Sequence, residues 1–314
     1  MGNLIIVFLI LLSISYTFAA IVSKDGSEDY TTIAEAIAQA PTFSAKPYII
    51  LVRAGIYEEY LIVPYEKTNI RLTGDGVKCT RIVGYRSTSG SLIPVNQNLA
   101  FANGGGPDAG PGVAVLNVGD KTAFYKCSFE GYQDTLWAGS GRQFYRQCNI
   151  YGTVDFILGN AAAVFQNCML YARYNEFLVF TAQSRENQDQ QTGFVFQNCK
   201  FTMSPEDSDR KSEVIRASLG RPWRAYSRVV ILFSYIDSLI DPRGWEMYRT
   251  VPTNRLSYIE FGNEGPGSRT NGRVNWPGVK VFYDKSEVEG FTVSVFLSGD
   301  TWIPQTGIPC NKGL

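Results

Sequence analysis

Two aspartates, Asp134 and Asp155, end a pattern that occurs twice in the sequence. The two copies lie 21 residues apart and read Cys127-x3-Gly131-x2-Asp134 and Cys148-x3-Gly152-x2-Asp155. Two carboxylates held close together repel each other, which raises the pKa of one while the other stays ionised. Such a pair supplies an acid and a base, or an acid and a nucleophile, from one residue type. Asp and Gly also recur in the turns of structural repeats, so spacing alone leaves a purely structural role open.

The residues next to the two aspartates favour a catalytic role over a purely structural one. Asp155 lies between Val154 and Phe156, an apolar setting in which a carboxylate needs a cationic partner, and Gln133 places an amide donor next to Asp134. Further along, LGRPWRAYSR carries an arginine that can hold a carboxylate through two hydrogen bonds and a tryptophan that can face a sugar ring, Arg221 and Trp223. An ordinary salt bridge in a surface turn is the alternative for this arginine.

Composition excludes several classes of site. The chain has 314 residues with 29 basic and 29 acidic side chains. Its formal net charge is zero, so it has no excess of positive charge with which to bind nucleic acid or an anionic membrane. Histidine is absent, which rules out a Ser-His-Asp triad, a Cys-His pair and a His-ligated zinc site.

A repeat must position the two aspartates. An aromatic residue shortly before a cysteine recurs in FYKC, FYRQC, FQNC and FQNC, with the cysteines at 127, 148, 168 and 199. Steps of 21, 20 and 31 residues suit successive turns of a solenoid, the last with a loop insertion. We therefore predict an all-β fold, a right-handed parallel β-helix, with a short helix at 32–40 capping its N-terminal end. An antiparallel sandwich is the alternative, but it gives no reason for a step near 20.

Residues one repeat apart would lie above one another at the strand spacing of ~4.8 Å. Cys127 would stack on Cys148, and Asp134 on Asp155. Stacked cysteines are close enough for a disulfide, and free core thiols are the alternative. Cys168 with Cys199 is the favoured disulfide pair.

The first 19 residues, MGNLIIVFLILLSISYTFA, have no charged side chain and end in small residues, which predicts a secretory signal peptide. A transmembrane anchor is the alternative, although three hydroxyl residues interrupt the apolar run. The rest of the chain, 20–314, is expected to form a single exported domain.

GYQDTL, GTVDFILGNAA and LGRPW resemble the signature motifs of the pectin methylesterases (pectinesterases), particularly those of plants. The resemblance covers nearly the whole of 20–314, without the inhibitor-like pro-region that many plant members carry. It implies an esterase that hydrolyses the methyl esters of homogalacturonan (pectin) in the cell wall. It also implies no metal or organic cofactor, a monomer, no nucleic-acid or membrane partner, and a pectinesterase inhibitor protein as a partner.

On the matching positions, the resemblance makes Asp155 the nucleophile and Asp134 the acid and base. Gln133 would stabilise the oxyanion, and Arg221 would keep Asp155 ionised. The substrate-binding residues would be Trp223, Trp245, Tyr132, Phe156 and Trp137.

Two departures from the family pattern bear on activity. Pro111 stands where members carry a second oxyanion glutamine, and proline has no donor to offer. Between Gly84 and Asn98 the chain is about a dozen residues short, roughly half a solenoid turn. These departures predict a weakened esterase, or a non-catalytic pectin-binding relative. A glycoside hydrolase or lyase on the same fold is a third hypothesis, since paired carboxylates ~5 Å apart also suit a retaining glycosidase.

Overall fold

A computed structural model describes residues 19–85 and 95–314 of the chain. Most of the predicted signal peptide, residues 1–18, lies outside the described residues. So does most of the predicted shortening between Gly84 and Asn98, at residues 86–94.

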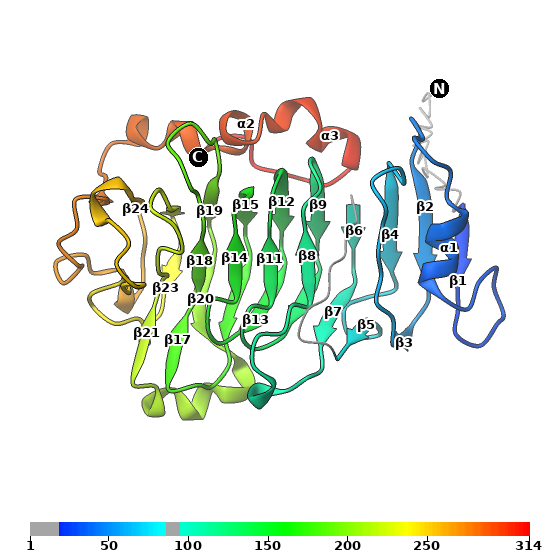
Figure 1. Ribbon diagram of the computed structural model, residues 1–314, viewed down its shortest axis with the longest axis horizontal. Helices are drawn as coiled ribbons and strands as arrows, with labels where there is room; N and C mark the ends of the chain where they lie inside the picture. The colour runs from blue at the N-terminus through cyan, green and yellow to red at the C-terminus, as the bar shows by residue number, and fades with distance from the viewer. Residues whose placement is uncertain (1–18, 86–94) are drawn as a thin grey trace, which may run out of the picture.

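The chain winds into a parallel β-helix, and the predicted fold class is confirmed. Its strands form three long stacks, and each strand pairs in parallel with the strand one turn before or after it (Figure 1). The first sheet contains β1 (Ala20–Val22), β2 (Tyr48–Val52), β4 (Ile70–Gly74), β6 (Val95–Gln97), β9 (Thr122–Tyr125), β12 (Arg142–Arg146), β15 (Ala162–Gln166), β19 (Gly193–Gln197), β22 (Arg228–Leu232), β24 (Ser257–Phe261) and β25 (Val279–Val281).

The other two stacks contain eight and four strands. The second sheet contains β3 (Gly55–Tyr57), β5 (Thr80–Gly84), β7 (Ala100–Asn103), β10 (Ser128–Glu130), β13 (Asn149–Gly152), β16 (Met169–Ala172), β20 (Lys200–Met203) and β23 (Tyr235–Ile236). The third sheet contains β8 (Val115–Asn117), β11 (Leu136–Ala138), β14 (Ile157–Gly159) and β18 (Thr181–Gln183). Beside it lies a two-stranded pair, β17 (Phe177–Val179) and β21 (Arg216–Ser218).

The corner between the first and second sheets explains the repeated motif. The residue before each of the four cysteines has a positive φ of 51° to 57°, and these residues are Lys126, Gln147, Asn167 and Asn198. A left-handed residue turns the chain sharply, and asparagine tolerates that conformation better than most residues. The side chains on either side of the corner then point into the solenoid, where identical types stack on one another.

Aromatic rings and cysteines fill the core behind this corner. Phe124, Tyr145, Phe165 and Phe196 form a continuous stack with ring centroids 5.1, 4.6 and 4.7 Å apart and interplanar angles of 6°, 9° and 13°. All four rings are buried. Offset stacks of this kind contribute more than their buried area alone, so they set the vertical order of the turns.

The predicted Cys168–Cys199 disulfide is wrong for this structure. All six cysteines of the chain lie within the described residues, and each is a free thiol. The cysteines do stack, since Met169 pairs with Lys200 in the parallel ladder. However, the Cys199 Sγ donates a hydrogen bond to the Phe165 carbonyl oxygen at 3.2 Å, and the Cys168 Sγ donates to Tyr145 at 3.4 Å. The thiols therefore satisfy carbonyls of neighbouring turns instead of joining each other.

The N-terminal end of the solenoid carries the predicted helix, α1 (Ile33–Gln39), which lies beside β1 and β2 (Figure 1). It begins after Thr32, whose hydroxyl accepts a hydrogen bond from the Glu35 N–H, as is common at helix N-termini. Its Ile33 and Ile37 are buried. Its action as a cap of the solenoid stays a prediction.

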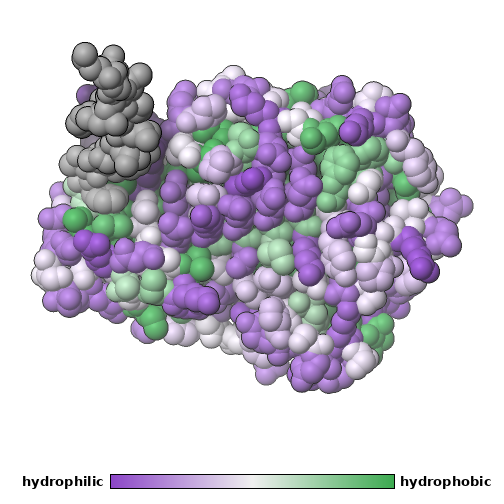
Figure 2. All heavy atoms as spheres, turned by 180° about the vertical axis from the view of Figure 1, so that it is seen from behind, coloured by the Kyte–Doolittle hydropathy of each residue, from purple (hydrophilic) through white to green (hydrophobic). Residues whose placement is uncertain are grey.

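The C-terminal segment covers part of the first sheet with short helices, α2 (Val293–Phe296) and α3 (Ile303–Thr306) (Figure 1). Val293, Trp302 and Ile303 pack in one cluster with outward residues of that sheet such as Phe144 and Val195. Among residues 19–85 and 95–314, no helix is long and apolar enough to span a bilayer. The face shown in Figure 2 is mainly hydrophilic, with hydrophobic residues in small separate areas.

Candidate active site

The two repeated aspartates occupy equivalent corners, just before neighbouring strands of the third sheet. Leu136 pairs with Ile157 in the parallel ladder, so Asp134 lies one turn from Asp155, and the Asp134 N–H donates to the Val154 carbonyl at 3.1 Å. Both aspartates are left-handed, with φ of 65° and 53°. A left-handed backbone at a residue other than glycine is strained, and such residues are frequent at functional sites. Here each of them lies two positions before a strand, β11 or β14.

The glycine of the repeat is required by the same corner. A Cβ on Gly152 would lie 2.7 Å from the Tyr132 carbonyl oxygen and 2.2 Å from the Phe156 Cβ. That oxygen also accepts a hydrogen bond from the Thr153 N–H at 2.9 Å. The Thr135 hydroxyl ties the turns together by donating to the Tyr151 carbonyl at 2.8 Å. The two aspartate corners can therefore pack directly on one another.

Arg221 holds Asp155 from two turns further along the solenoid. Its backbone N–H donates to the Thr181 carbonyl at 2.9 Å, which fixes the residue beside β18. From there its Nε and Nη2 donate to the two carboxylate oxygens of Asp155 at 2.8 and 2.6 Å. The Asp155 side chain is 2% exposed, and a buried carboxylate needs such a charged, two-pronged partner.

The environments of the two carboxyl groups differ. Burial and then the negative charge of Asp155 raise the pKa of Asp134 from 3.8 to about 7, with Arg221 opposing. Burial also raises the pKa of Asp155, but the hydrogen bonds and charge of Arg221 counteract that rise. Because Arg221 donates two hydrogen bonds to Asp155, ionisation is favoured at Asp155, whereas Asp134, with a pKa of about 7, is partly protonated near neutral pH.

Gln133 directly precedes Asp134 and contacts the preceding turn at Gly112. It is half-buried, and its backbone carbonyl accepts a hydrogen bond from the Gly112 N–H at 3.0 Å. Pro111, the residue before Gly112, is exposed next to this contact. The structure therefore places Pro111 one turn from Gln133, where its ring offers no hydrogen-bond donor.

Aromatic side chains flank the aspartates on the surface. Trp137 is 42% exposed on the outer face of the third sheet, where its neighbour one turn on is Leu158. Trp223 is half-buried and stacks on Tyr248 with ring centroids 4.3 Å apart. Tyr248 also lies under the Arg221 guanidinium, 4.7 Å from it. These rings offer flat faces close to the carboxylates.

Two predicted substrate-binding residues are core residues instead. Phe156 is 0% exposed and packs on Phe180 with ring centroids 4.9 Å apart, because the left-handed Asp155 turns the next side chain inward. Trp245 is 3% exposed and stacks on Tyr258 at 4.2 Å, so its ring faces the interior. Neither presents a face to a sugar, and that part of the prediction is wrong.

Sequence reasoning missed two side chains at this site. Tyr248 belongs to a loop that folds back onto the LGRPW segment, and no repeat or motif spacing marks it. Arg173 follows β16 and lies over the Tyr132 ring at 4.8 Å. Its position could have been found from the stack, since Tyr171 pairs with Tyr151 one turn away.

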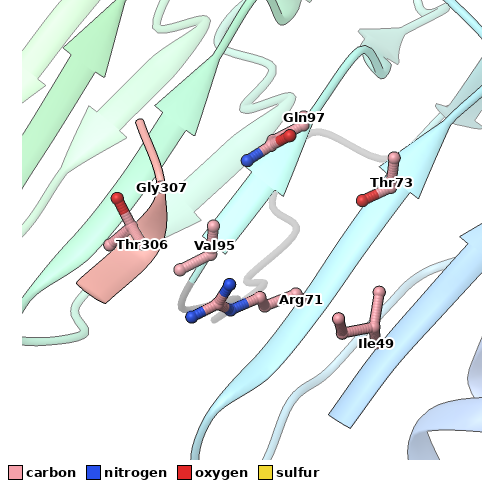
Figure 3. Close-up of a pocket in the computed structure, with 7 residues that line it drawn as sticks. All are labelled: Ile49, Arg71, Thr73, Val95, Gln97, Thr306 and Gly307. Carbon is pink, nitrogen blue, oxygen red and sulfur yellow. The ribbon is translucent and has the colours of Figure 1, made fainter. Parts of the chain in front are cut away.

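A separate hollow of about 170 Å³ lies on the outer side of the first sheet (Figure 3). Residues of β2, β4 and β6 line it together with Thr306 and Gly307 from the C-terminal segment. Arg71 crosses it between Ile49 and Val95 and donates a hydrogen bond to the Gln305 carbonyl. This hollow is a seam between the C-terminal segment and the sheet, and the aspartate pair belongs to other strands.

The family model and similar curated proteins indicate the same family. The sequence profile of the Pectinesterase family matches residues 19–300. Probable pectinesterase 30 of Arabidopsis thaliana is 42% identical over 311 residues, which are 94% of this chain and 62% of that protein. Pectinesterase 2 of Citrus sinensis is 41% identical over 310 residues, or 94% of this chain and 60% of that protein. The chain thus spans less than two thirds of the length of these relatives.

Solved structures agree with the fold. Pectin methylesterase from carrot superposes with a TM-score of 0.92 at 36% identity, covering 95% of this chain and 98% of that one. A pectin methylesterase from Erwinia chrysanthemi superposes at 0.71 with 26% identity, covering 90% and 98% of the two chains. A further relative, matched at 0.71 and 26% identity over 90% and 98% of the chains, is an aspartate-to-alanine mutant in complex with a hexasaccharide.

Proposed function

The chain belongs to the pectinesterase family, and from that premise we propose that it hydrolyses the methyl esters of homogalacturonan. The products are methanol and a free galacturonate carboxylate, and the polysaccharide chain keeps its length. The observation that carries the proposal is the column formed by Arg221, Asp155 and Asp134. It favours the ionised form of Asp155 and raises the pKa of Asp134 to about 7, so that Asp134 is partly protonated near pH 7.

In the first half of the reaction, a carboxylate oxygen of Asp155 attacks the ester carbonyl carbon. The carbonyl electrons move to oxygen, and the Gln133 amide donates a hydrogen bond to the oxyanion. As the carbon–oxygen bond to the methoxy group breaks, Asp134 gives its proton to that oxygen and methanol leaves. The galacturonate is now joined to Asp155 as an acid anhydride, and Asp134 is ionised.

In the second half, Asp134 takes a proton from water, and the resulting hydroxide attacks the galacturonyl carbon. The bond to Asp155 breaks, which restores its carboxylate and releases the free acid. Asp134 ends protonated and ready for another cycle. Arg221 serves both halves because it stabilises the Asp155 carboxylate as attacking and as leaving group.

Aromatic faces are the natural supports for the sugar rings. Trp137 is exposed and Trp223 half-buried, and Tyr132 adjoins Gln133 in sequence. We assign the substrate to the surface between these three rings. The corresponding roles for Phe156 and Trp245 are dropped because both rings are buried.

Pro111 lowers the expected turnover without removing the reaction. The proposed nucleophile, acid and arginine lie together, so a purely pectin-binding role is not favoured. We further propose that the protein acts outside the cell on wall pectin, after export directed by residues 1–19. A pectinesterase inhibitor protein is a proposed partner, in line with relatives such as probable pectinesterase/pectinesterase inhibitor 39 of Arabidopsis thaliana.

The test is a paired product assay on highly methylated pectin. Methanol release measures ester hydrolysis, and new reducing ends measure chain cleavage. We expect methanol with no increase in reducing ends. Reducing ends without methanol would replace the esterase with a glycoside hydrolase, and neither product from folded protein would leave binding alone.

A further inference from the structure

Two arginines lie close together where the chain leaves the third sheet for the first, and neither has an acidic partner. Arg185 follows β18 and is 4% exposed, and Arg228 begins β22 and is half-buried. Within residues 19–85 and 95–314, neither side chain makes an ion pair. Buried charges in proteins are normally paired with an opposite charge, because burial removes the water that stabilises them. Two like charges at this corner therefore require a compensating group.

Backbone carbonyl oxygens solvate Arg185 without supplying a negative charge. Its Nε donates to the Gln190 carbonyl at 2.8 Å, its Nη1 to the Tyr226 carbonyl at 3.4 Å, and its Nη2 to the Gln188 carbonyl. Asp189 belongs to the same loop, but it is exposed and makes no ion pair with Arg185 in the described part of the chain. The charge of Arg185 is therefore left without a bound counter-charge.

Arg228 has even fewer partners. Its Nη1 donates to the Thr192 carbonyl at 3.3 Å, whereas its Nε is buried and has no hydrogen-bond partner among the described residues. Its stem lies flat on Gly193, where a Cβ would come within 2.8 Å of the Arg228 Cδ. Burial and then the charge of Arg185 lower the pKa of Arg228 from 12.5 to about 10. Both effects disfavour the charged form, and an anion beside the two arginines would oppose them.

A buried amide joins the two arginines. Gln183 is the last residue of β18 and is 0% exposed. Its Oε1 accepts hydrogen bonds from the backbone N–H groups of Arg185 and Arg228, at 3.0 and 2.8 Å. These two bonds fix the orientation of the amide, and its Nε2 is left buried without a partner in the described part of the chain. Buried donors without a partner are rare and indicate an ordered water or ion that the protein atoms alone do not show.

We propose that a small inorganic anion of the size of chloride binds between Arg185, Arg228 and Gln183. It accepts hydrogen bonds from the Arg228 Nε and the Gln183 Nε2, and its charge balances the two guanidinium groups. A water molecule would satisfy the two donors but leave both charges unbalanced. A small anion fits better than a large oxyanion, because Gln183 is fully buried and the Arg185 donors already bind carbonyls. The inference does not depend on the proposed esterase function.

The first test follows the melting temperature while chloride replaces gluconate, a larger organic anion. The ionic strength stays at about 0.2 M, so that screening is the same throughout. An anion that binds only the folded protein raises the melting temperature, and the rise saturates once the site is full. We expect a saturating rise of about 3 °C in the unchanged protein. No rise, or a rise that stays linear in chloride as a general salt effect does, would overturn the proposal.

Gln183→Glu is the sharpest variant. It keeps an oxygen to accept the two backbone N–H groups and puts a negatively charged oxygen where the Nε2 was, so the chain carries its own anion. We expect it to melt higher than the unchanged protein in gluconate and to lose the chloride response. Arg228→Gln removes one cation and should lose the response as well. Arg224→Gln is the matched control, because Arg224 is exposed and paired with Glu186 at 3.4 Å, and it should keep the full response.

Bromide locates the ion directly and does not depend on any variant being folded. Crystals of the unchanged protein grown with bromide in place of chloride should show an anomalous peak within hydrogen-bond distance of the Arg228 Nε and the Gln183 Nε2. A peak there, with a saturating response of the melting temperature, supports the proposal. An ordered water without anomalous signal would overturn it. A bromide peak without a saturating response would mean an adventitious ion only, and would overturn it too.

Discussion

At the scale of single residues, the site depends on one arginine that binds one of two neighbouring carboxylates and so makes their environments different. Arg221 binds Asp155 through both oxygens, and Asp134 is left with burial and a negative neighbour. This cation therefore makes two equal side chains different, and in the proposed mechanism Asp155 is the nucleophile and Asp134 the acid. The arrangement needs no histidine, and the chain has none.

The raised pKa of Asp134 has a stability cost with a definite sign. In the unfolded chain this carboxyl ionises at its ordinary value of 3.8, whereas in the folded chain it ionises at about 7. Its contribution to the free energy of unfolding is thus fully present below pH 3.8 and lost as pH rises through 7. Asp134→Asn should therefore be more stable than the unchanged protein at pH 8, by about 1–2 kcal/mol after allowance for solvent screening.

Urea unfolding at pH 4 and at pH 8 measures this difference. The gain should be small at pH 4, where the carboxyl is protonated in the folded protein. Asp108→Asn, in an exposed turn, is the control and should leave stability unchanged at both pH values. A gain in Asp134→Asn that is equal at the two pH values would contradict the raised pKa.

Pro111 gives a second prediction at this scale. Pro111→Gln restores an amide donor one turn from Gln133 and should raise kcat, because an oxyanion donor is worth roughly 10²–10³ in turnover when it is well placed. We expect a gain of about tenfold or more in methanol release. Pro111→Ala is the control, since it relieves the ring without adding a donor. An equal effect of both substitutions would show that the backbone, not the amide, matters.

At the scale of elements, left-handed corners and stacked side chains hold the turns in order. Each corner between the first and second sheets is followed by a buried cysteine. Two residues before each corner lies a buried ring, and these rings stack on one another: Phe124, Tyr145, Phe165 and Phe196. Phe165 touches the rings on both sides. The third sheet, and with it both aspartates, depends on the same vertical spacing.

Phe165→Ala tests that dependence. It should lower the free energy of unfolding by about 3–5 kcal/mol, the usual cost of a buried phenylalanine cavity. Phe165→Leu should cost less, because it keeps most of the volume. Trp137→Ala, on the exposed face, is the matched control and should cost under about 1 kcal/mol. Denaturant unfolding gives all three values, and equal losses for Phe165→Ala and Trp137→Ala would contradict the core stack.

The stacking of strands and corners could be predicted in part from the sequence. The repeat of Cys, Gly and Asp predicts that the turns stack and that Asp134 lies next to Asp155. It does so because the interval between its two copies equals the length of one solenoid turn. The direction of each side chain is less accessible, because it depends on which corner residue is left-handed. That is why Phe156 and Trp245 were expected at the surface and are buried.

Contacts made by loops were the hardest to predict. Tyr248 reaches Trp223 and Arg221 only because its loop folds back over the LGRPW segment. Arg173 reaches the Tyr132 ring from the corner after β16, and its place in the stack marks it although no motif does. The contacts of Tyr248 have no signature in residue spacing.

At the scale of the whole molecule, a continuous core supplies the cohesion that a disulfide was expected to give. The cysteines at 127, 148, 168 and 199 are buried in a column, each with its thiol donating to backbone carbonyls. The solenoid is thus held by hydrogen-bonded ladders and stacked rings across many turns.

Reducing agent should therefore leave stability unchanged. The melting temperature is expected to be the same with and without dithiothreitol, whereas loss of a structural disulfide costs typically 2–4 kcal/mol. Thiol titration of the unfolded protein should count all 6 cysteines. A lower melting temperature under reducing conditions, or a count short by two, would contradict the free thiols.

The most direct test of the central claim is methanol release from highly methylated pectin by the unchanged protein and by Asp155→Asn. The substitution keeps the size of the side chain and removes the nucleophilic carboxylate that Arg221 holds. The account predicts release by the unchanged protein and a loss of about 10⁴-fold or more in folded Asp155→Asn. Retention of a tenth or more of the activity would contradict Asp155 as the nucleophile.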